Sequence, residues 1–174
     1  MTRVVACESQ EPGSVSIVWS NGERTIYRCD TAAHRVTVTD QAGRPCFAFG
    51  SRGAHPGQFE SPMDVAFVTP EFDGEDLPTH LAAALWLAVA DYGNQRVQVF
   101  ELDGCLVGSV DDIEEAAMGH PCRLRWRAPI LDVETIDGAH ARIHLGAALL
   151  FASEPLGMPL AMRGPHGGSP ERHH

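Results

Sequence analysis

The chain has 174 residues, of which 44% are hydrophobic, enough for one domain with a sizeable core. Its net charge of −10 disfavours binding to a nucleic-acid backbone, and its apolar runs are too short to span a bilayer. The first residues lack the hydrophobic core of a signal peptide and the five cysteines form no CxxC pair, so we expect a cytoplasmic protein with reduced thiols.

Short runs of alternating apolar residues, separated by turn residues, predict β-strands from the start of the chain. The first five predicted strands are 3–9, 15–20, 24–30, 35–40 and 45–49. Asn21-Gly22 is a strong hairpin signal between the second and third of them. Residues 51–61 contain the glycines and prolines of a loop, which leads into a strand at 63–68.

The next stretch, 69–84, is predicted to be an inserted loop that starts with acidic residues. Three more strands follow, separated by turns at Tyr92–Gln95 and Asp103-Gly104; they are 86–91, 96–102 and 105–110.

The chain repeats itself. Residues 25–50 match residues 86–110 at an offset of 61, which aligns Asp30 with Asp91 and Arg35 with Arg96. A weaker third copy keeps the same spacing in Asp137 and Arg142. In each copy the aspartate and arginine flank a turn, so the spacing can join carboxylate and guanidinium across the hairpin. We interpret the three pairs as structural contacts that hold the turn of each hairpin, with ligand binding as the alternative.

The repeated text resembles the NHL repeat, which forms one blade of a β-propeller. The matching residues are Gly57-Gln58-Phe59, Pro62, Asp91, Asn94, Arg96-Val97-Gln98-Val99-Phe100 and Asp103-Gly104. The match covers 25–110 closely and 111–153 weakly. The insert makes the spacing of 61 longer than the roughly 40–45 residues of an ordinary four-stranded blade.

The C-terminal region begins with an acidic stretch, 111–121, predicted to be a helical turn or a loop. Four strands are predicted after it, at 122–127, 130–135, 141–146 and 148–153. Proline and glycine then dominate, and we expect residues 163–174 to form a flexible tail.

The predicted fold is all-β. It is a propeller-type array of about three four-stranded NHL-like blades within residues 1–162, at about 3–50, 57–110 and 120–153. Propellers close with typically four to eight blades, so three blades leave two open flanks. The sequence therefore predicts a dimer that closes a six-bladed ring.

Two groups of residues are candidates for binding. Arg123, Arg125 and Arg127 alternate along one strand and share one face, which suits an anion or an acidic partner. The alternative is a solvated face that protects a sheet edge. Asp64 begins a predicted innermost strand, whose end would face the central channel of a propeller.

No catalytic centre is predicted. The nine histidines show no zinc-type spacing, no cysteine has a nucleophile's context, and we expect neither metal nor cofactor. The resemblance implies protein–protein interaction, with RNA as the lesser option because the chain is acidic. We therefore predict a non-catalytic scaffold that binds a protein partner and no membrane. The alternatives are a metal-dependent lactonase-like or lyase-like propeller enzyme and a structural subunit of a larger assembly.

Overall fold

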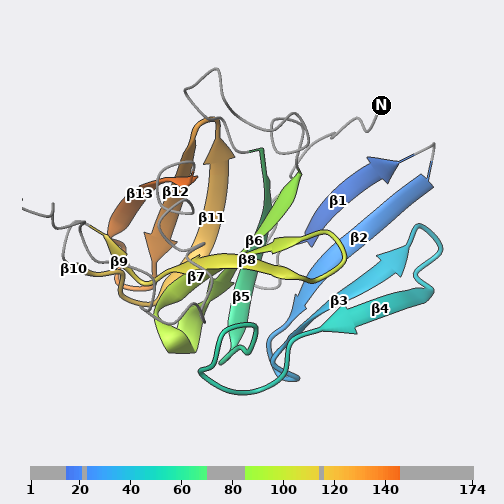
Figure 1. Ribbon diagram of the computed structural model, residues 1–174, viewed down its shortest axis with the longest axis horizontal. Coiled ribbons are helices and arrows are strands. Elements are labelled where there is room, and N and C mark those ends of the chain that lie inside the picture. The colour runs from blue at the N-terminus through green and yellow to red at the C-terminus, as the bar shows by residue number, and fades with distance from the viewer. Residues whose placement is uncertain (1–14, 21–22, 70–84, 114–115, 146–174) are drawn as a thin grey trace, which may run out of the picture.

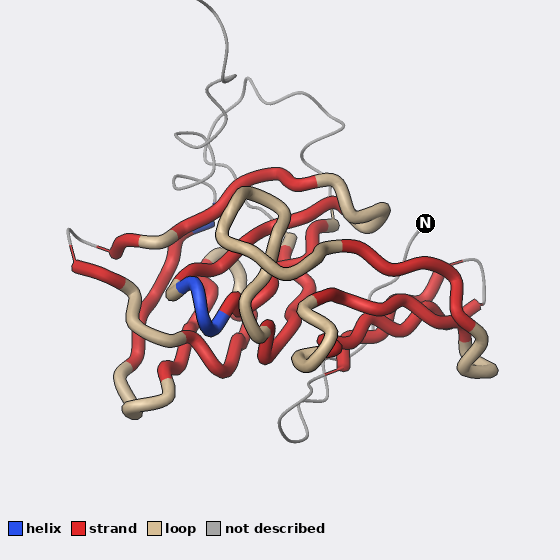
Figure 2. Tube along the Cα trace, turned by 90° about the horizontal axis from the view of Figure 1, so that it is seen from below, coloured by secondary structure: helices blue, strands red, loops and turns tan. Residues whose placement is uncertain are grey.

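The computed structural model of the chain describes residues 15–20, 23–69, 85–113 and 116–145. Several predicted features therefore lie outside the described residues: the strands at 3–9 and 148–153, the turn at 21–22, most of the insert 69–84, and the tail 163–174. Strands make up most of the part that is described (Figure 2). In that part, no helix has the length and hydrophobicity needed to cross a bilayer.

The first sheet is an antiparallel meander of four strands, each paired with its neighbour in sequence. Its strands are β1 (Val15–Ser20), β2 (Glu23–Asp30), β3 (Arg35–Asp40) and β4 (Pro45–Phe49). The alternating pattern of the sequence predicts these strands to within one residue. The Asp40 carboxylate closes the turn after β3, because its Oδ1 accepts from the amides of Ala42 and Arg44 at 2.8 and 2.9 Å.

The second sheet repeats this meander with four strands. They are β5 (Pro62–Val68), β6 (Trp86–Asp91), β7 (Arg96–Glu101) and β8 (Leu106–Val110). A 3₁₀ turn, η1 (Tyr92–Asn94), joins β6 to β7. Gln95 follows it with a φ of +55°, a left-handed conformation that ends the turn and starts β7 in register.

The acidic stretch that follows corrects one expectation. Residues 111–121 were predicted to be a helical turn or a loop, but the structure places a two-stranded antiparallel ribbon there, β9 (Asp112–Ile113) with β10 (Ala116–Ala117). The pairing is only two residues long on each side, so it has no periodicity that a sequence pattern would reveal.

The third sheet holds three strands within the described residues, in the order β11-β12-β13. They are β11 (Pro121–Arg127), β12 (Ile130–Thr135) and β13 (His140–His144). A fourth strand, expected at 148–153, falls outside the described part of the chain.

The three sheets stack side by side in chain order (Figure 1), and they do not close into a ring. The middle sheet packs on both sides, since β5 contacts β2 of the first sheet and β11 of the third. Both of its faces are therefore apolar. Val65 and Leu87 belong to the cluster shared with the first sheet, whereas Ala66 and Ala88 belong to the cluster shared with the third. This double burial explains why β6 is buried at every position.

Tyr27 of β2 lies in the core between the first two sheets. Its ring is buried edge-on against Phe67, and its hydroxyl donates to the carbonyl oxygen of Leu102 at 2.8 Å. Burial raises the pKa of Tyr27 to about 12, with smaller contributions from Cys46 and Asp103. An unperturbed tyrosine has a pKa of about 10. The unfolded chain therefore ionises first as the pH rises, so the contribution of neutral Tyr27 to stability is present below pH about 10 and is lost as the pH passes about 12.

This raised pKa gives a first testable prediction. Tyr27→Phe is expected to remove a step centred near pH 12 from the tyrosinate absorbance titration of the folded protein. Circular dichroism recorded alongside establishes that the protein is folded over that step. Loss of a step near pH 10 instead would contradict the burial of Tyr27 between the two sheets.

Candidate binding face on the third sheet

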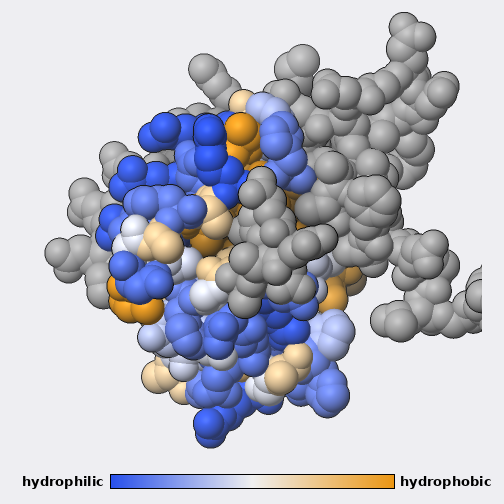
Figure 3. Space-filling model, turned by 90° about the vertical axis from the view of Figure 1, so that its left-hand side faces the viewer, coloured by the Kyte–Doolittle hydropathy of each residue, from blue (hydrophilic) through white to orange (hydrophobic). Residues whose placement is uncertain are grey.

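The outer face of the third sheet, turned away from the middle sheet, carries a cluster of charged side chains. We call it the arginine face; it consists of Arg123, Arg125, Arg127, Asp132, Glu134, His140 and Arg142. These residues line an open depression of about 270 Å³. Figure 3 views the molecule from the side on which the third sheet lies in Figure 1, and hydrophilic residues dominate the coloured surface there.

Strand alternation separates this face from the core. Leu124 and Leu131 point inward and are fully buried, while the residues on either side of each point outward. The strand register then aligns the outward residues in rows across the sheet. One row is Arg123, Glu134 and His140, and the next is Arg125, Asp132 and Arg142.

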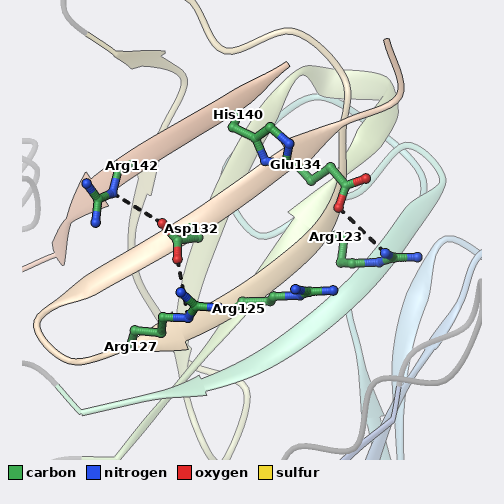
Figure 4. Close-up of a pocket in the computed structure, with 7 residues that line it drawn as sticks. All are labelled: Arg123, Arg125, Arg127, Asp132, Glu134, His140 and Arg142. Atoms are coloured by element: carbon green, nitrogen blue, oxygen red, sulfur yellow. Dashed lines mark ion pairs between the residues drawn. The ribbon is translucent and has the colours of Figure 1, made fainter. Parts of the chain in front are cut away.

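Ion pairs join neighbouring strands of the arginine face (Figure 4). Asp132 is shared by two arginines, at 3.3 Å from Arg142 and 3.7 Å from Arg127, and Glu134 lies 3.6 Å from Arg123. These distances exceed the roughly 2.7–2.9 Å of a direct charge-assisted hydrogen bond. The three arginine side chains are also 46–73% exposed, so water screens the attraction. Exposed pairs of this kind contribute only about 0–1 kcal/mol each.

Arg125 differs from its neighbours because it has no ion-pair partner among the described residues. Its register partner is Asp132, which is already engaged by the two other arginines. Figure 4 shows the Arg125 side chain projecting between those of Arg123 and Arg127. Its guanidinium therefore keeps planar N–H donors available for a carboxylate or another oxyanion.

The arginine face has the opposite sign to the chain as a whole. Its four arginines and two carboxylates give a net charge of +2 with His140 neutral, in a chain of net charge −10. A local excess of cations on an acidic protein directs an anionic ligand to that one place. The face can therefore bind an anion without any covalent chemistry.

Asp64, the other predicted binding residue, has a different position. It is only 2% exposed, and its two carboxylate oxygens accept the amide N–H groups of Val65 at 2.8 Å and Leu124 at 2.7 Å. The second of these bonds joins β5 to β11 and so ties the middle sheet to the third. Asp64 thus lies buried between the middle and third sheets, and its expected channel-facing role stays a prediction.

The repeated aspartate–arginine pairs fall into two different environments. Asp30 and Arg35 are register partners at the end of the β2–β3 hairpin and lie 3.4 Å apart at the surface. Asp91 and Arg96 occupy the equivalent corner of the second sheet, but they are buried and lie 2.8 Å apart.

The buried pair is part of a hydrogen-bond network. The two terminal nitrogens of Arg96 donate to the carbonyl oxygens of Ala54, His55 and Gln58 at 2.9–3.0 Å. Asp91 accepts from further donors, namely the Asn94 and Gln98 side chains and the Glu60 amide. With the bond to Asp91, the described contacts use four of the five guanidinium N–H groups of Arg96, so this network fixes the loop at 51–61 against the second sheet.

The third expected pair is not formed. Arg142 is the register partner of Asp132 and makes its ion pair with that residue, whereas Asp137 lies in the turn after β12. The Asp137 carboxylate accepts hydrogen bonds from the Thr135 hydroxyl and the Ala139 amide, which lower its pKa. The spacing matches the other copies, but Asp137 lies inside the turn between β12 and β13, whereas Asp30 and Asp91 are the last residues of their strands. The same separation in sequence therefore does not place Asp137 and Arg142 opposite each other.

Sequence reasoning found three arginines of the face and missed its acidic partners. Asp132 and Glu134 are separated by one residue in a strand that was predicted correctly, and their alternation with Leu131 and Val133 is the signal that places them outward. His140 is one of the nine histidines, for which the sequence predicts no binding role. In the described residues, no group of three or more histidine, cysteine or acidic side chains is arranged to hold a metal ion.

Comparison with known proteins adds no functional information. No protein-family model matches the chain, and no curated protein is significantly similar to it. The resemblance to NHL repeats therefore stays a hypothesis that depends on the residues themselves.

Proposed function

We propose that this protein is a non-catalytic protein-interaction scaffold, in which three NHL-like propeller blades present the arginine face to an acidic partner. Three consecutive antiparallel sheets, stacked in chain order through apolar faces, support the blade assignment. The observation that carries the binding proposal is the guanidinium of Arg125, which has no ion-pair partner among the residues that the structure describes and lies among three weakly paired arginines. Surface arginines that form only weak ion pairs within the protein remain able to bind a carboxylate of another molecule.

The dimeric six-bladed ring expected from the sequence would place the arginine face against the first sheet of a second copy. The outward side chains of that sheet include exposed Arg28 and Arg35, with Asp30 already paired to Arg35. The contact would oppose arginine to arginine. We therefore propose that the binding form is an open array of three sheets with its arginine face free. Light scattering is expected to give the mass of one chain, and a stable dimer that survives high salt would contradict this arrangement.

The binding proposal predicts capture of a simple acidic ligand. Fluorescein-labelled hexaglutamate is expected to bind the protein at low ionic strength, with an affinity that falls as salt rises. The triple variant Arg123→Gln, Arg125→Gln and Arg127→Gln is expected to weaken binding about five- to thirty-fold, since two exposed charge contacts of about 0.5–1 kcal/mol each are lost. Fluorescence anisotropy measures the dissociation constants.

A matched control removes the same charge elsewhere. Arg28→Gln, Arg35→Gln and Arg44→Gln together also remove three exposed arginines, but from the first sheet. We expect this variant to bind hexaglutamate within about two-fold of the wild type, apart from the small effect of net charge. If both triple variants lose affinity equally, the attraction is general and the arginine face is not the site.

A further inference from the structure

We propose that the arginine face selects an extended peptide whose carboxylates occupy alternate positions; this inference depends on the acidic-partner function above. The reason is geometric. Arg123, Arg125 and Arg127 lie on the same face of β11 at every second residue. A strand rises about 3.3–3.4 Å per residue, so successive arginines are roughly 6.7 Å apart. A ligand in an extended conformation repeats its side chains on one face with the same period.

The acidic residues of the face confine such a ligand to one path. Asp132 and Glu134 occupy the central strand, β12, and would repel carboxylates placed over it. The outward positions of β11 carry the three arginines and no acidic residue. A peptide is therefore expected to lie along β11 and not across the sheet.

The central contact of this path is Arg125. It has no ion-pair partner in the described part of the chain, so it can bind a ligand carboxylate without breaking an existing ion pair. The flanking arginines must exchange partners. Arg123 leaves Glu134 at 3.6 Å, and Arg127 leaves Asp132 at 3.7 Å, which retains Arg142. Breaking these pairs costs little free energy because they are long and exposed. Each arginine can then form two parallel hydrogen bonds to a ligand carboxylate.

The spacing of the three arginines distinguishes two peptides that carry the same number of carboxylates in a different order. A peptide with three carboxylates at alternate positions reaches all three arginines at once. A peptide with three consecutive carboxylates points one of them away from the face and reaches at most two arginines. The difference is one charge-assisted contact, about 1 kcal/mol, which corresponds to about five-fold in affinity.

The experiment compares two labelled hexapeptides of identical composition. One has the order Glu-Thr-Glu-Thr-Glu-Thr and the other Glu-Glu-Glu-Thr-Thr-Thr. Wild-type protein is expected to bind the alternating peptide about five-fold more tightly in fluorescence anisotropy. Arg123→Gln is expected to abolish this preference, because both peptides can then reach the two remaining arginines of β11, Arg125 and Arg127. Arg142→Gln, which removes a charge from the same face but from β13, is expected to retain it.

The outcomes separate this inference from the function it depends on. Equal binding of both peptides by wild-type protein overturns the alternating register and leaves the acidic-partner function intact. If neither these peptides nor hexaglutamate bind, the proposed function itself fails. If a single-stranded hexauridylate binds more tightly than the alternating peptide and displaces it, the face is a nucleic-acid site and the inference is overturned. Circular dichroism of each variant establishes that it is folded.

Discussion

Replacing Arg96 with alanine is expected to lower the free energy of unfolding by about 3–5 kcal/mol, which would be one of the largest effects of a single substitution in this chain. Asp91 is 0% exposed and loses the guanidinium that lies 2.8 Å from its carboxylate. The side-chain amides of Asn94 and Gln98 still donate to Asp91 but carry no charge. The Ala54 carbonyl loses its donor at the same time, while the His55 carbonyl keeps only the Gln58 amide and the Gln58 carbonyl keeps only the Gln98 side chain. Urea unfolding followed by circular dichroism measures the change.

The repeat supplies a control at the equivalent corner of the first sheet. Arg35 is 48% exposed and lies 3.4 Å from Asp30, so Arg35→Ala is expected to cost no more than about 1 kcal/mol. The two variants remove the same residue type from the same place in a hairpin, and the two sites differ in burial and in the loop carbonyls that Arg96 also contacts. Similar losses in both would show that the second pair is not desolvated, and the network at 51–61 would lose its assigned role.

The difference between these two corners marks what the sequence predicts and what it does not. Spacing alone identifies Asp30–Arg35 and Asp91–Arg96 as register partners, because hairpin geometry is local. Burial of the second pair depends on a loop 38–42 residues away in sequence, whose carbonyls receive the Arg96 donors. No local pattern contains that contact, so the sequence gives the two copies the same role although their environments differ.

A similar limit applies to the third sheet and to Asp64. Alternation predicts that Arg123, Arg125 and Arg127 share a face, which the strand register and burial pattern of β11 bear out. The partner of Arg142 depends on where the turn before it lies: Asp137 falls inside that turn instead of ending β12, so the register places Arg142 opposite Asp132. Asp64 was placed at the start of the correct strand, but its bond to the Leu124 amide spans 60 residues and follows from how the sheets stack.

Phe59→Ala is the second substitution with a large expected effect, a loss of about 3–5 kcal/mol in the free energy of unfolding. The ring of Phe59 is 0% exposed and packs against those of Phe49 and Phe100, at centroid distances of 6.4 and 5.5 Å. It anchors the loop that connects the first sheet to the second. Phe47→Ala is the matched control, because Phe47 is 39% exposed on β4 and its truncation leaves no enclosed cavity; a loss of about 1 kcal/mol or less is expected.

The position of the Phe59 ring is fixed by Gly50, and a double-variant cycle tests this directly. A Cβ at residue 50 would lie 2.3 Å from two ring carbons of Phe59, and the residue has a φ of +87°. Gly50→Ala alone is therefore expected to be strongly destabilising, through both the clash and the strained backbone. In the Phe59→Ala background the clash disappears and only the backbone cost of about 1–3 kcal/mol remains, so the double variant should lose less stability than the sum of the single variants. Additive losses would mean that the ring does not lie over Gly50, and the packing of the connecting loop against the two sheets would have to be different.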